Sequence, residues 1–290
     1  MQRLVDLPQP YSPLAPIRRR RPGGRAARAG GAGAEGQRRA AEIGRIAGQL
    51  ARVAETVPWG RVQDDRFDTL SRFVYRTRSA AAVRARAEQV ADELGTALGA
   101  DRRGFVHYAL RRWYCFWGAR LAELLFLGHA GVRPGPPKHH EIDFTIDGVP
   151  FDLKTTEVPR AFAGPAEAWL SDPGKLAAWL YRNQSREGRF HTANRLFLVL
   201  CDPERPTEAW RLRGDVGALS AAIDGFMRRR RFVELSLPDG AGGERRVVTA
   251  VVPVLPPPRA PQQLSLNLLF ARVPEPVAEP QRRPVQPRLL

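Results

Sequence analysis

Cysteine is scarce in this chain of 290 residues, and apolar runs long enough to cross a membrane are missing. Cys115 and Cys201 each stand in apolar surroundings, which favours two buried thiols in a reducing compartment over a disulfide framework. No signal peptide is visible, because the basic run at 18–21 is followed by Pro-Gly-Gly and not by apolar residues. We therefore expect a cytoplasmic protein with no membrane partner.

Lysine is also rare, although the chain is strongly basic. Lys and Arg together number 46 against 30 Asp and Glu, giving a net charge of +16, yet the only lysines are Lys138, Lys154 and Lys175. A GC-rich genome explains arginine in place of lysine, but it does not explain the excess of cations. That excess favours a polyanionic partner, with nucleic acid as the first candidate. Lys154 is then expected to do what a guanidinium does not, since a compact ammonium with a tunable pKa suits water activation.

Residues 141–154 have the pattern of a β-hairpin. The Asp-Gly dipeptide at 147–148 favours a two-residue type I′ turn, and apolar and polar residues alternate on either side of it. This turn places Asp143 directly across from Asp152, with Lys154 two residues further along the same face. Directly opposed residues have Cβ atoms about 5 Å apart, so the two carboxylates repel unless positive charge lies between them. A divalent cation is the simplest candidate, because Mg²⁺ binds through one or two carboxylates and substrate phosphates.

Asp143 and the triplet Asp152-Leu153-Lys154 resemble the signature of the PD-(D/E)XK nuclease superfamily, the fold of many restriction endonucleases and Holliday-junction resolvases. The chain departs from that signature at Ile142, where the family often has proline. The resemblance implies phosphodiester hydrolysis that depends on Mg²⁺ or Mn²⁺. Asp143 and Asp152 would hold the metal, and Lys154 would orient or activate the attacking water. The alternative is an ordinary hairpin with a polar outer face.

The resemblance adds two further catalytic candidates. The superfamily commonly begins its core with a helix whose Glu reaches the metal site, and Glu123 lies near the end of the apolar helix predicted over 105–127. Glu123 is also spaced to pair with Arg120 on the same helix. Similar nucleases often place a Gln on the helix after the acidic-x-Lys strand, which makes Gln184 a candidate. A polar helix end is the alternative explanation for Gln184.

Histidines near the hairpin raise the alternative of a zinc site. His129, His139, His140 and Glu141 are close in sequence, but no HExxH motif is present. The two adjacent histidines would point in opposite directions on a strand. The sequence therefore does not favour zinc.

The expected fold is α/β, with a restriction-endonuclease-like α/β/α core and a mixed sheet over 101–255. Residues 1–40 are predicted to be a disordered basic arm, and 41–100 a helical N-terminal region with one long helix over 64–98. Within the core, helices are expected over about 165–187 and 216–229. Strands are expected over 195–201 and 247–255, the first of them buried on both faces. Residues 256–290 are predicted to be a Pro-rich disordered tail.

Two segments are candidates for partner binding. Arg228, Arg229, Arg230 and Arg231 end the helix before the last strand, where they suit both the helix dipole and a phosphate backbone. In the tail, Gln263, Leu264, Leu266 and Leu268 resemble the peptide that binds the bacterial sliding clamp. The same residues could instead form an edge strand of the core.

The sequence thus predicts a metal-dependent nuclease that acts on DNA, in restriction and defence or in repair. A homodimer would supply two sites for cutting both strands, although nothing in the sequence requires one. The rival prediction, from a different class, is a non-catalytic nucleic-acid-binding or clamp-tethered accessory protein on a nuclease-like fold.

Overall fold

The computed structural model describes residues 3–5, 27–60, 64–95, 101–137, 142–162, 166–183, 193–238 and 242–257. The described residues all belong to one compact unit that ends at Pro257. Gln184, His139, His140, Glu141 and the clamp-like peptide at 263–268 lie outside the described residues.

The first four helical segments of the described structure are α1 (Ala27–Thr56), α2 (Asp65–Leu70), the 3₁₀ turn η1 (Arg72–Tyr75) and α3 (Ala80–Leu94). The helix α1 begins well before residue 41, so the prediction of a disordered arm to residue 40 is wrong for 27–40. Helix formation is cooperative, and the segment that buries Ile46, Leu50 and Val53 can propagate into the Ala- and Arg-rich sequence before it.

The single helix predicted over 64–98 is also wrong. The chain leaves the helix at Ser71, whose hydroxyl donates to the Phe67 carbonyl and is fully buried. A new helix begins after Ser79, whose side chain accepts from the Ala82 N–H as an N-cap. The segment is thus divided, and side-chain hydrogen bonds of Ser71 and Ser79 stabilise the end of one helix and the start of the next.

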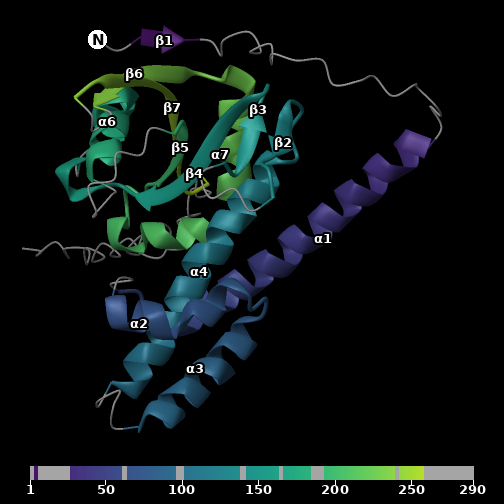
Figure 1. Cartoon of the computed structure of the whole chain (residues 1–290), viewed down its shortest axis with the longest axis vertical. Coiled ribbons are helices and arrows are strands. Elements are labelled where there is room, and N and C mark those ends of the chain that lie inside the picture. The colour runs from purple at the N-terminus through teal and green to yellow at the C-terminus, as the bar shows by residue number, and fades with distance from the viewer. Residues whose placement is uncertain are drawn as a thin grey trace, which may run out of the picture. The chain divides into compact units, whose positions relative to one another are not determined.

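The helix α4 (Arg102–Phe126) is the apolar helix that the sequence predicts, and it contacts both the helical region and the sheet. It packs against α1 and α3, and also against β4 and α7 (Figure 1). Buried side chains occur around most of its circumference, as expected for a central helix.

The remaining described elements are three successive strands, then helices on both sides of one further strand, and finally two strands. They are β2 (Val132–Pro134), β3 (Phe144–Ile146), β4 (Val149–Glu157), η3 (Arg160–Phe162), α5 (Ala166–Leu170), α6 (Pro173–Asn183), β5 (Arg195–Leu200), η4 (Pro206–Gly214), α7 (Val216–Arg229), β6 (Phe232–Pro238) and β7 (Glu244–Val254). The helix predicted over 165–187 is divided at Pro173, since proline is tolerated in the first turn of a helix but not in its interior.

The described strands form one mixed sheet of seven strands in the order β1-β6-β7-β5-β4-β3-β2, with β1 at Arg3–Val5. Strands β4, β5 and β7 are parallel, and the other pairs are antiparallel. The α/β class and the mixed sheet are therefore confirmed. The sequence prediction omitted β1, β2 and β6.

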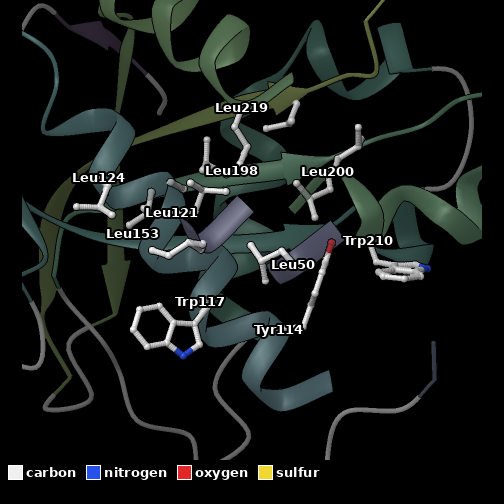
Figure 2. Packing of buried hydrophobic residues seen from close by; sticks show 14 of the residues in the cluster. Leu50, Tyr114, Trp117, Leu121, Leu124, Leu153, Leu198, Leu200, Trp210 and Leu219 are labelled. Carbon is white, nitrogen blue, oxygen red and sulfur yellow. The ribbon is translucent and has the colours of Figure 1, made fainter. Parts of the chain in front are cut away.

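Helices cover both faces of this sheet. On one face, leucines of α4 and α7 pack against leucines of β4 and β5, and Figure 2 shows Leu121, Leu124, Leu153, Leu198 and Leu219 gathered there. On the other face, Leu176 and Leu180 of α6 pack with Phe197 and Val199 of β5. The run at 195–200 is fully buried because both layers contact it, as its continuous apolar sequence predicts. No helix in the described ranges has the length and apolarity that a membrane crossing requires.

Candidate active site at the start of strand β4

The predicted turn fixes the hairpin of β3 and β4. Asp147 and Gly148 both have positive φ, 48° and 88°, as a type I′ turn requires. Ile146 pairs with Val149 and Phe144 with Phe151, so the predicted register is confirmed along β3.

The ladder ends one residue before the predicted pair of carboxylates. Strand β3 begins at Phe144, and the N–H of Asp143 donates to the Phe151 carbonyl at 2.9 Å. The Asp143 carboxylate accepts a hydrogen bond of 2.7 Å from the N–H of Leu153. Asp143 therefore lies beside the Asp152–Lys154 segment, although it is not paired with Asp152 as a ladder residue.

The Asp143 carboxyl group has an unusual electrostatic environment. Burial raises its pKa, and the negative charges of Asp152 and Glu123 act in the same direction. The hydrogen bond from Leu153 and the positive charge of Lys154 act in the opposite direction without cancelling the rise. The structure thus brings Glu123, Asp143, Asp152 and Lys154 into one electrostatic neighbourhood.

Asp152 is almost entirely buried, with 6% of its surface exposed, and both of its oxygens have cationic partners. One oxygen lies 2.8 Å from Lys154 Nζ, and the other lies 3.2 Å from Nε of Arg195. Arg195 is 4% exposed and sits directly opposite Asp152 on the parallel strand β5. Lysine and arginine therefore supply the positive charge that the sequence prediction assigned to a metal ion alone.

Arg195 is the residue of this site that the sequence prediction missed. Its guanidinium lies over the ring of Tyr181 on α6, with Cζ 5.3 Å from the ring centroid, and the Tyr181 hydroxyl donates to the Ala193 carbonyl at 2.9 Å. The available signal was a charged residue at the first position of a strand that is otherwise apolar throughout. Cross-strand pairing with Asp152 explains why an arginine is stable there, but that pairing depends on the parallel register of β4 and β5.

Glu123 approaches the site from α4. Its carboxylate pairs with Arg120 one turn earlier, which is the local ion pair that the sequence offered as the alternative to a catalytic role. Its side chain is 18% exposed, and its charge nevertheless acts on Asp143. Both interpretations of Glu123 are therefore compatible with the structure.

The four arginines at the C-terminal end of α7 do not act as one group. Arg230 is the left-handed C-cap of α7, with φ of 45°, and its guanidinium pairs with Asp147 of the hairpin turn. It also donates to the Ala130 carbonyl at 3.1 Å. Arg230 therefore holds the hairpin turn against α7, and its contact with phosphate stays a prediction. Arg228, Arg229 and Arg231 are exposed.

The nearby histidine that the structure describes also has a local partner. The Nε2 atom of His129 lies 3.2 Å from Oδ1 of Asp224 on α7. In the described ranges, no three His, Cys, Asp or Glu side chains are grouped closely enough to hold a metal ion. A closed protein-only metal cage is therefore not part of the described structure.

An open site for a hard cation needs less than such a cage. Mg²⁺ keeps several water ligands and commonly binds through one or two carboxylates together with substrate phosphates. Asp143 and Asp152 supply two carboxylates, and burial, together with the charges of Asp152 and Glu123, raises the pKa of Asp143, so a cation beside it would stabilise its charged form. These residues fit one hard divalent cation of that kind.

No family model matches this chain, and comparison with the curated proteins and with the solved structures likewise finds no match.

Proposed function

We propose that this protein is a metal-dependent nuclease that hydrolyses phosphodiester bonds in DNA, on a restriction-endonuclease-like core. The observation that supports it most is that four charged residues lie in one electrostatic neighbourhood. They are Glu123 of α4, Asp143 directly before β3, and Asp152 and Lys154 of β4. Glu123 is distant in sequence from the other three residues, which lie in one hairpin and follow the pattern that resembles the PD-(D/E)XK signature. The net charge of +16 favours a polyanionic substrate.

In this proposal the residues have distinct roles. Asp143 and Asp152 would hold Mg²⁺ or Mn²⁺, which supplies Lewis-acid polarisation of the scissile phosphate and acidifies a bound water. Arg195 keeps the Asp152 carboxylate in place through their buried ion pair. The Lys154 side chain is 41% exposed, so its ammonium can reach a water molecule while its positive charge offsets negative charge that develops on the phosphate.

The second candidate function is non-catalytic nucleic-acid binding on the same fold. The observation that favours it is the pairing of both Asp152 oxygens with Lys154 and Arg195, which compensates the buried charge without any metal. Both functions predict DNA binding, but only the nuclease predicts metal-dependent cleavage.

Incubation with DNA separates the two functions. Plasmid, branched DNA and single-stranded DNA are incubated with the full chain, with Mg²⁺ or Mn²⁺ and with chelator. The nuclease proposal expects strand breaks in at least one substrate that require the metal. Binding to all three substrates without any cleavage would contradict the proposal and favour the non-catalytic function.

The raised pKa of Asp143 gives the pH dependence of the activity. A carboxyl group whose folded-state pKa is raised keeps its proton to higher pH, and a protonated carboxyl group does not hold a cation. Ionising Asp143 is also less favourable in the folded state than in the unfolded state. The free energy of unfolding should therefore fall as pH rises from the ordinary pKa of a carboxyl group to the raised pKa of Asp143. Metal-supported cleavage should therefore increase with pH as Asp143 loses its proton.

Glu123→Gln provides the check on this assignment. Removing the negative charge of Glu123 should lower the pKa of Asp143 and move the acid limb of the rate profile to lower pH. The measurement is the single-turnover cleavage rate of both proteins from acidic to neutral pH at one fixed metal concentration below saturation, so that proton and cation compete for Asp143. An acid limb at the same pH in both proteins would show that Asp143 does not control it.

A further inference from the structure

Two exposed aromatic side chains touch each other on the helical part of the chain. Among the described residues, three large hydrophobic side chains are exposed by 36% or more: Tyr75 at 44%, Phe116 at 36% and Leu255 at 40%. Tyr75 of η1 and Phe116 of α4 form an edge-to-face pair with ring centroids 5.0 Å apart. These two residues are called the aromatic platform below.

The rings of the aromatic platform are held in place by their neighbours. The Tyr75 hydroxyl accepts hydrogen bonds of 2.8 and 3.1 Å from Arg112, whose Cζ lies 4.9 Å from the centre of the same ring. Arg112 is itself anchored by a hydrogen bond of 2.9 Å to Ser71 Oγ. Phe116 packs edge to face on Trp117, with centroids 5.6 Å apart. Rings fixed in this way lose little conformational entropy when a ligand binds.

Arginines lie near the aromatic platform in sequence, and two of them are paired with carboxylates: Arg112 with Asp68 at 3.2 Å, and Arg120 with Glu123. Arg72, Arg76 and Arg78 are exposed on η1 and directly after it. On α4, Arg112 and Arg120 lie four residues before and after Phe116, on neighbouring turns of the same face. The surface therefore combines exposed aromatic rings with guanidinium groups, which suits a polyanion whose units also have flat apolar faces.

Phe116 of the aromatic platform lies on the same face of α4 as Glu123 of the candidate active site. Phe116 and Glu123 are seven residues apart, which is about two turns or about 10 Å along the helix axis. Arg120 lies between them and pairs with Glu123, whose charge acts on Asp143. One strand of nucleic acid could therefore contact the aromatic platform and the carboxylates together.

We propose that the aromatic platform stacks on unpaired bases, so that the substrate of the candidate site contains a single-stranded stretch. A duplex buries the faces of its bases within the stack, whereas an unpaired strand presents base faces and phosphates together. The exposed arginines would contact the phosphates, while Phe116 and Tyr75 would contact the bases. The inference rests on the proposed function only in placing that strand at the carboxylates.

The test measures binding without divalent metal, so that it does not depend on cleavage. The probes are an oligothymidylate of about 12 nucleotides, an abasic deoxyribose-phosphate strand of the same length, and a duplex. Phe116→Leu keeps an apolar side chain but removes the ring, and it should weaken oligothymidylate binding on the order of 10-fold, because base–aromatic stacking contributes that much per base. Its binding to the abasic strand and to the duplex should stay unchanged.

Two further variants make the result specific to the ring. Phe116→Trp supplies another aromatic ring and should retain wild-type affinity for oligothymidylate. Leu255→Ala alters the third exposed apolar side chain and should have no effect. Equal loss on the abasic strand, or unchanged oligothymidylate binding in Phe116→Leu, would overturn the inference. So would a change of oligomeric state in Phe116→Leu without loss of affinity, since the platform would then be a contact between copies.

The outcomes distinguish this inference from the proposed function. Stacking without metal-dependent cleavage would contradict the nuclease proposal and leave the aromatic platform supported. Cleavage with no preference for unpaired strands, together with unchanged binding by Phe116→Leu, would contradict this inference and leave the nuclease proposal supported.

Discussion

Lys154→Met should lower the rate of metal-dependent cleavage by about 10²–10⁴-fold, which is the usual contribution of a positioned proton-transfer group. Lys154 Nζ lies 2.8 Å from Asp152 and is partly exposed, so the change removes a charge from the site without opening the core. The measurement is the single-turnover cleavage rate at saturating Mg²⁺.

Lys154→Arg separates the chemistry of the ammonium group from simple charge. The chain has arginine at nearly every other cationic position, and a guanidinium keeps its charge under all ordinary conditions. We expect Lys154→Arg to bind DNA like the wild type and to cleave it about as poorly as Lys154→Met. Wild-type cleavage by Lys154→Arg would mean that only positive charge is needed, and would remove lysine scarcity as an argument for catalysis.

Arg195→Met should destabilise the fold by about 3–5 kcal/mol, because it leaves the buried carboxylate of Asp152 without its buried partner. Lys154 remains near Asp152, but its side chain is 41% exposed and solvent screens its charge. The measurement is the free energy of unfolding in urea. A loss below about 1 kcal/mol would show that the Asp152–Arg195 pair is not a buried charge pair in solution.

The double variant Asp152→Leu/Arg195→Met is the matched control. Replacing both members of a buried ion pair by apolar side chains is often neutral or stabilising, because no unpaired charge is left behind. The double variant should therefore recover most of the stability that Arg195→Met loses, although it lacks Asp152 and should not cleave DNA. Loss of stability equal to the sum of the two single changes would argue that Asp152 and Arg195 do not interact.

Much of the candidate site could be predicted from sequence because its information is local. The Asp-Gly turn determines the register of the hairpin, and the register determines which residues flank Asp152. The strand at 195–200 and the helix α4 carry continuous apolar patterns, which are also local. These features were predicted correctly.

What could not be predicted depends on contacts between distant segments. Arg195 meets Asp152 only because β4 and β5 pair in one particular parallel register. Arg230 meets Asp147 because the C-terminus of α7 lies against the hairpin turn. Nothing in the run of four arginines indicates that Arg230, and not its neighbours, forms an ion pair within the fold. The helix ends at Ser71 and Ser79 were missed because serine is also tolerated within helices, so the apolar spacing around them favoured continuity.

If Asp143 and Asp152 form a cation site for strand cleavage, the cleavage rate should depend on metal concentration only while both carboxylates are present. Wild-type protein and Asp143→Asn are compared on the substrate that the wild type cleaves, across a range of Mg²⁺ concentrations. The asparagine keeps the shape of the side chain but removes the charge that binds the cation. We expect that the wild-type rate rises with Mg²⁺ and saturates, while the rate of Asp143→Asn stays near the metal-free rate. A wild-type rate independent of metal, or the same titration curve for both proteins, would contradict it.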